Sequence, residues 1–280
     1  MATVQGTEPA VRRITPALPM LEIGMSSIPG TRKSQQDACS YEINPEQHEC
    51  LAVLCDGMGG LNGGERASQT AVSVLTEQYL QTAPVTEPVM FFQQAAFAAN
   101  QAVASLTDEG GKPLNAGSTL IAVLLRENQV SWLSIGDSRI YLIRDCEAYP
   151  CCREHNYETL LNDRLRAGEI TPEEAAEDST RRDALTSYLG MRELKQIEIN
   201  TQPLSLLPND MLLLCSDGLY KTLDQETICR MAVEHKMDVQ KAAELLTSEA
   251  LAQATKAQDN TTVILMRWQG DLFGDHFYGQ

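Results

Sequence analysis

Four aspartates stand where apolar runs of the chain begin or end, and this placement could create a metal site. Asp56 follows the run CLAVLC, Asp137 follows QVSWLSI, Asp217 follows DMLLLCS, and Asp259 precedes TTVILMRW. A carboxylate beside a buried strand is costly to desolvate unless it is paired or bound to a cation. Any one of them also suits an ordinary turn, because SDG and GDS are common turn sequences. Four together favour a site for hard divalent cations such as magnesium or manganese, which prefer oxygen ligands.

Glycines crowd the segment after Asp56, which reads DGMGGLNGGERAS. Without a side chain at Gly57, the backbone can approach a cation and its carbonyl can serve as a ligand. The alternative is a flexible connector between a strand and a helix. A dinucleotide-binding fingerprint fails because Asn62 stands where its third glycine belongs, and the chain has no G-K-[ST] phosphate loop.

The elements that must position these aspartates are short strands with long helices between them. Tight connections between strands favour antiparallel pairing, and the segment GDSR predicts a hairpin between 129–135 and 139–144. We therefore predict an α+β fold, a central antiparallel β-sandwich flanked by pairs of helices on both sides. The strand-like runs are 50–55, 118–125, 129–135, 139–144, 195–200, 210–216 and 261–268, and the helical segments are 63–81, 87–107, 224–235 and 238–255.

Composition excludes several classes of protein. The formal net charge of −16 argues against a nucleic-acid partner, which would need a basic surface. No apolar window reaches the ~18 residues of a membrane-spanning helix, and no signal-peptide core is visible. Eight cysteines occur without a C-x-x-C pair, and several lie in apolar runs, so we interpret them as buried or free thiols. These features predict a cytoplasmic protein without a membrane partner.

Five motifs occur in the order VLCDGMGGLNGGERAS, AGSTL, IGDSRIYL, LLCSDGL and QDNTTVILM. Together they resemble the metal-dependent protein phosphatases, the type-2C serine/threonine phosphatases, in their bacterial form. The resemblance covers residues 21–268 and implies one catalytic domain there, with 1–20 as a leader or edge segment and 269–280 as a tail. It also implies a flap insertion at about 151–185, although the polar composition of that segment equally fits a surface helix pair.

The resemblance implies a two-metal centre at one end of the sandwich. Asp56 would bridge both cations, the Gly57 carbonyl would complete one shell, and Asp217 and Asp259 would bind the other cation. Asp137 matches the position where bacterial members share a weaker third metal with Asp217.

Two further residues receive roles from the motif RKSQQDA. Asp37 matches an acidic residue that orders metal-bound water, and Arg32 matches the arginine that clamps the substrate phosphate. The chain departs from the family in having Gln36 where glutamate is usual, which removes one carboxylate near the metals. It also has Met58 where many eukaryotic members have histidine, so that position cannot supply a proton.

The implied reaction is hydrolysis of phosphoserine and phosphothreonine by a hydroxide bridging two manganese or magnesium ions. The expected partners are phosphoproteins, with a bacterial serine/threonine kinase as the opposing enzyme, and the expected state is a monomer. Two alternatives stay open. One is a catalytically silent member that binds phosphoproteins, suggested by Gln36. The other is a two-metal hydrolase of small phosphoesters.

Overall fold

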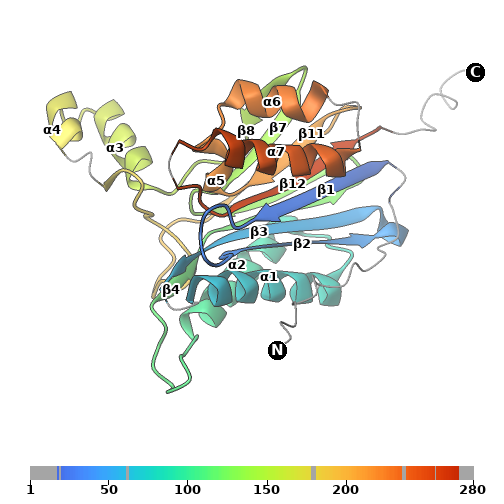
Figure 1. Cartoon of the computed structure of the whole chain (residues 1–280). Helices are drawn as coiled ribbons and strands as arrows, with labels where there is room; N and C mark the ends of the chain where they lie inside the picture. Colours follow the sequence, from blue (N-terminus) through green and yellow to red (C-terminus); the bar gives the residue numbers. More distant parts are fainter. Residues whose placement is uncertain are drawn as a thin grey trace, which may run out of the picture.

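Two antiparallel sheets pack face to face, and a pair of helices covers each outer face (Figure 1). The computed structural model describes Leu18 and residues 20–60, 63–177, 181–234, 238–255 and 257–270. The four layers confirm the predicted sandwich. The predicted leader 1–20 and tail 269–280 lie almost wholly outside the described residues.

Every strand pair in both sheets is antiparallel. The first sheet has the order β1 (Leu21–Ile28), β12 (Thr261–Trp268), β11 (Met211–Cys215), β7 (Arg139–Arg144) and β8 (Glu147–Pro150). The second sheet has the order β10 (Leu204–Ser205), β6 (Gln129–Ile135), β5 (Leu120–Arg126), β3 (Glu49–Gly59) and β2 (Asp37–Asn44), with β4 (Ala116–Ser118) paired to β3 and β9 (Glu198–Ile199) paired to β6.

The helices lie close to their predicted positions. Pro88 stands in the first turn of its helix, where its missing N–H is harmless. Asp224 caps another, because its carboxylate accepts a hydrogen bond from the Thr227 backbone N–H at 2.7 Å. The second sheet is covered by α1 (Gly63–Thr82) and α2 (Pro88–Ala104), and the first by α6 (Gln225–Glu234) and α7 (Val239–Gln253), while η1 (Pro45–Gln47) and α5 (Asp217–Tyr220) are single turns.

The strands read as continuous apolar runs because both of their faces are buried. In β5, Ile121 and Val123 pack in the cluster between the two sheets. Their neighbours Leu120 and Ala122 pack in the cluster beneath α1 and α2. A half-exposed strand would instead alternate apolar and polar residues. The buried strands therefore form a rigid platform, and the aspartates stand at its end.

The segment GDSR does not form the predicted hairpin. Strands β6 and β7 belong to different sheets, and the connection between them is a corner of the sandwich. Ile135 ends β6 in the cluster under the helices, whereas Ile140 enters the cluster between the sheets. Gly136 permits the turn with φ of +103°. Glycine–aspartate turn residues suit either geometry, so the local sequence could not distinguish them.

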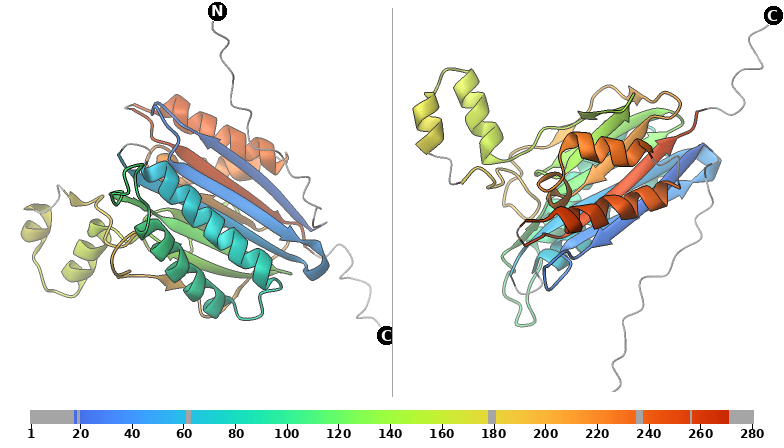
Figure 2. Two further views of the ribbon diagram at one scale, coloured as in Figure 1. Left: turned by 90° about the horizontal axis from the view of Figure 1, so that it is seen from below. Right: turned by 45° about the horizontal axis from the view of Figure 1, so that its top comes forward.

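The polar insertion at 151–185 forms two helices, and the chain segments before and after them run side by side as a short stem. Helices α3 (Tyr157–Arg166) and α4 (Pro172–Glu177) stand away from the sandwich in Figures 1 and 2. The stem closes by backbone hydrogen bonds, including one from the Thr186 N–H to the His155 carbonyl at 2.8 Å. That the insertion acts as a flap stays a prediction.

Several strands were not foreseen, namely β1, β2, β8 and β10. Strand β2 lies at a sheet edge and reads DACSYEIN, in which only Asp37 is fully buried, so no apolar run marks it. All eight cysteines are free thiols, as predicted. None of the described helices combines the length and apolarity that a membrane crossing requires.

Candidate metal centre

The four strand-end aspartates line one pocket of about 270 Å³. Asp56 comes from the far end of β3, Asp137 from the corner between β6 and β7, Asp217 from the start of α5, and Asp259 from the approach to β12. Gly57 also lines this pocket. Strands β3, β6 and β11 end beside this pocket and strands β7 and β12 begin beside it, because one antiparallel strand ends where its neighbour begins.

Asp37 stands directly opposite Asp56, a pocket residue, in the pairing of β2 with β3. Carboxylates opposite each other on paired strands repel and destabilise a sheet. Ser216 donates a hydrogen bond to Oδ2 of Asp37 at 2.8 Å, but the buried Oδ1 has no hydrogen-bond partner among the described residues. Burial raises the pKa of Asp37 to about 6, although the nearby hydroxyls of Thr262 and Ser216 oppose the rise.

The pocket also disfavours the charged form of two more carboxylates. Burial raises the pKa of Asp56 well above its usual value, and the carboxylates of Asp37, Asp217 and Asp137 add to the rise. Burial likewise raises the pKa of Asp137 to about 6, with Asp217 adding to it. A divalent cation bound among these carboxylates would neutralise their charge and remove their mutual repulsion. The residues therefore fit magnesium or manganese.

The carboxylates share a pocket but do not form a closed cage. Among the described residues, no three histidine, cysteine or acidic side chains converge as a ready-made metal cluster. Two basic side chains pair with these carboxylates. Arg32 Nη2 lies 2.6 Å from Oδ2 of Asp259, and Lys221 Nζ lies 2.7 Å from Oδ2 of Asp217.

Gly57 is required by close packing. A Cβ atom there would lie 2.0 Å from the carbonyl oxygen of Gly64 and 2.6 Å from that of Gln36. The close approach seen at Gly57 is to the first turn of α1 and to the chain before β2, whereas the approach predicted from the sequence was to a cation. The carbonyl's role as a metal ligand stays a prediction.

Backbone-binding residues that sequence reasoning missed hold the acidic residues in place. The Thr119 hydroxyl accepts a hydrogen bond from the Asp56 N–H at 2.8 Å. The Asn260 side chain accepts one from the Gln36 N–H at 2.8 Å and donates to the carbonyls of Pro29 and Ser34. Both residues stand inside the quoted motifs AGSTL and QDNTTVILM, so motif membership was the available signal.

The unusual Gln36 has a structural partner. Its amide donates a hydrogen bond to the Gly59 carbonyl at 3.0 Å, which a carboxylate could not do. The substitution therefore ties the chain before β2 to the glycine segment that follows Asp56.

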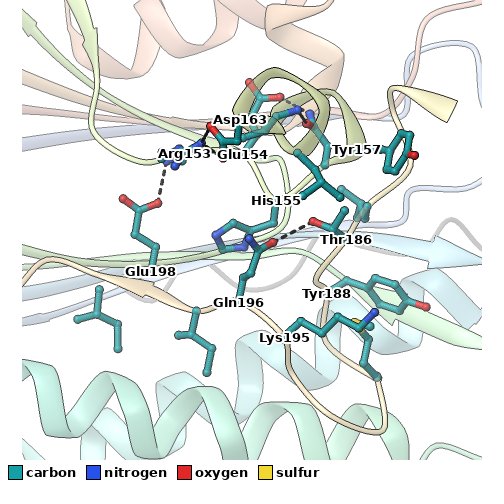
Figure 3. Close-up of a pocket in the computed structure, with 17 residues that line it drawn as sticks. Arg153, Glu154, His155, Tyr157, Asp163, Thr186, Tyr188, Lys195, Gln196 and Glu198 are labelled. Atoms are coloured by element: carbon teal, nitrogen blue, oxygen red, sulfur yellow. Dashed lines mark hydrogen bonds and ion pairs between the residues drawn. The ribbon is translucent and has the colours of Figure 1, made fainter. Parts of the chain in front are cut away.

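A second, larger cavity of about 1,040 Å³ adjoins the metal centre, because Leu185 lines both. Figure 3 shows it between the stem of the insertion and the region of β9. Its polar side chains bond to one another: Thr186 donates to Gln196 at 2.9 Å, and Arg153 pairs with Asp163 at 2.7 Å. His155 is anchored here, since its Nδ1 accepts from the Gly136 N–H at 3.2 Å.

Fold and pocket define a class of protein, a helix-flanked β-sandwich with an acidic cation site at one end. A family model described as protein phosphatase 2C matches residues 30–257. The chain belongs to this family. The protein phosphatase PhpP of Streptococcus pneumoniae is 32% identical over 238 residues, which cover 84% of this chain and 92% of that protein.

Solved structures agree with this assignment. The serine/threonine phosphatase PstP/Ppp of Mycobacterium tuberculosis superposes with a TM-score of 0.74 and 29% identity, covering 89% of this chain and 99% of that one. The PstP catalytic domain in complex with two manganese ions gives 0.70 and 28%, covering 88% and 97%. The predictions of the family, of a serine/threonine phosphatase and of manganese or magnesium as cofactor are confirmed.

Proposed function

We propose that this chain hydrolyses phosphoserine and phosphothreonine in proteins with two manganese or magnesium ions, opposing a serine/threonine kinase. The observation that carries the proposal is that Asp56, Asp137, Asp217 and Asp259, from distant parts of the chain, line one pocket. The ions would be held by Asp56, the Gly57 carbonyl, Asp217 and Asp259. When bound, they would lower the pKa of a bound water and neutralise charge on phosphoryl oxygens.

Arg32 binds the substrate phosphate in this proposal. Its side chain is 57% exposed at the pocket, and its guanidinium pairs with Asp259. A planar guanidinium suits two phosphoryl oxygens at once. Because the same group also pairs with a proposed cation ligand, a cation at Asp259 would compete for that carboxylate and release Arg32 toward phosphate.

Asp37 positions water in the proposed reaction. Its Oδ1 has no hydrogen-bond partner among the described residues, and its carboxylate faces Asp56 across paired strands. An unsatisfied acceptor at this point can take a hydrogen bond from a water beside Asp56. The hydroxyl of Ser216 fixes the other oxygen, Oδ2, so that the carboxylate keeps one orientation.

The test measures hydrolysis of p-nitrophenyl phosphate and of a phosphothreonine peptide, with manganese and with EDTA. We expect activity only with manganese, and a loss of at least about 100-fold in kcat/KM for Asp217→Asn. Asp145→Asn is the matched control, because Asp145 is exposed in the turn after β7 and has a left-handed φ of 52°, which asparagine tolerates. Activity that survives EDTA would contradict the proposal.

The same assay separates the two alternatives. A silent phosphoprotein-binding module would hydrolyse neither substrate, even with manganese. A hydrolase of small phosphoesters would act on p-nitrophenyl phosphate but not on the peptide. The Gln36 substitution that suggested the silent module is accommodated by its bond to Gly59, and the four strand-end aspartates all line the pocket. A monomeric state and a cytoplasmic location remain predictions.

A further inference from the structure

Lys221 is a basic residue inside an acidic pocket, and its contacts explain why it is there. It stands four residues after Asp217 and follows the single turn α5, so its side chain reaches back to that of Asp217 at the start of the turn. Its Nζ lies 2.7 Å from Oδ2 of Asp217 and 3.8 Å from Oδ2 of Asp137. The ammonium therefore lies between the carboxylate that follows β11 and the carboxylate at the corner between β6 and β7.

A third carboxylate lines the same pocket from outside the sandwich. Asp183 belongs to the returning arm of the insertion, whereas Asp137 and Asp217 stand at strand ends. Lys221 therefore lies in a pocket lined by carboxylates from separate segments of the chain.

An ammonium and a divalent cation compete for the same oxygens. Lysine offers three N–H donors and no acceptor, so it satisfies carboxylates as a small metal ion would. A divalent cation bound between Asp137 and Asp217 would have to displace this positive charge or bind beside it, and like charges repel. Arg32 does not fill this position, since it pairs with Asp259.

We propose that the Lys221 ammonium takes the place of a third divalent cation between Asp137 and Asp217, so that this chain binds two such ions rather than three. The proposal rests on the two-ion function above. It departs from the weaker third metal that the family resemblance implies for Asp137. In this chain, Asp137 instead pairs with the ammonium of Lys221 and helps to hold that side chain in place.

The test is the number of Mn²⁺ ions bound per full-length chain, measured by isothermal titration and by electron paramagnetic resonance of free Mn²⁺. We expect two ions for the unmodified chain and for Lys221→Arg, which keeps the charge. Lys221→Met keeps the length without the charge, so we expect a third ion. Adding Asp137→Asn to Lys221→Met should remove that third ion again.

The outcomes separate this proposal from the function on which it rests. Fewer than two ions in the unmodified chain would overturn the two-ion site itself. Three ions in the unmodified chain would overturn the lysine assignment alone, and this measurement does not depend on the folding of any variant. Two ions in a Lys221→Met chain with unchanged circular dichroism would overturn it as well.

Discussion

Replacing Gly57 by alanine should disrupt both the stability and the metal affinity of this protein. The added Cβ would meet the Gly64 carbonyl oxygen at 2.0 Å and the Gln36 carbonyl oxygen at 2.6 Å. Both obstacles are backbone atoms of neighbouring segments, so no side-chain rotation can relieve the overlap. The first turn of α1 or the chain before β2 must move.

The size of the effect follows from that geometry. Ordinary contact needs 3.4 Å, so Gly64 must retreat by about 1.4 Å. Overpacking of this kind costs about 3 kcal/mol. For a domain of this size, that loss lowers the melting temperature by about 6–12 °C. Displacement of the strand end that carries Asp56 should also weaken Mn²⁺ binding by about 10- to 100-fold.

The assay compares Gly57→Ala with Gly60→Ala, three residues away. Apart from its two chain neighbours, no atom of the described residues lies within 4 Å of a Cβ built at Gly60, so that variant should keep the free energy of unfolding within about 0.5 kcal/mol. Urea unfolding followed by circular dichroism gives the stability, and titration gives the Mn²⁺ affinity. Equal stability of the two variants would refute the argument that close backbone packing requires glycine at 57.

Two further predictions concern buried titratable groups. In EDTA at pH 7, Asp56→Asn should unfold at a higher temperature than the unmodified chain, because burial and neighbouring carboxylates disfavour the charged form of Asp56 and raise its pKa. Mn²⁺ at 100 times its Kd should stabilise the unmodified chain by about 2.7 kcal/mol and leave this variant unchanged, and a variant that gains equally would count against Asp56 as a ligand. Burial lowers the pKa of His155 from 6.5 to about 4, so its stabilising contribution is present above pH 6.5 and is lost as the pH falls toward 4. His155→Asn keeps an acceptor for the Gly136 N–H. Between pH 6.5 and 4, its free energy of unfolding in urea should fall by about 3 kcal/mol less than that of the unmodified chain. Identical pH profiles of the two proteins would exclude this role for His155.

The fold class could be predicted from the sequence because burial leaves a direct mark on it. Strands with two buried faces, such as β5, are continuous apolar runs, and the helices show their own period and caps. Strands without that mark were missed. Strand β2 is an edge strand of mixed residues, and its pairing with β3 depends on contacts that no local pattern records.

The candidate site was predictable as a set of residue types and only in part as an arrangement. The aspartates at strand ends were visible because an acidic residue interrupts each apolar run, as at Asp56. Their meeting in one pocket required antiparallel sheets, which the tight connections indicated. The supporting residues Thr119 and Asn260 were not assigned, because hydroxyl and amide side chains become informative only when their backbone partners are known.

The sequence by itself determined which side chains are available: carboxylates at strand ends, a glycine after Asp56, and apolar runs long enough to build two sheets. Only the tertiary structure decided that GDSR turns a corner, that Asp37 faces Asp56, and that Lys221 lies between Asp217 and Asp137. The reason is physical. Local patterns report burial and backbone preference, whereas the neighbours of a charge are set by segments far apart along the chain.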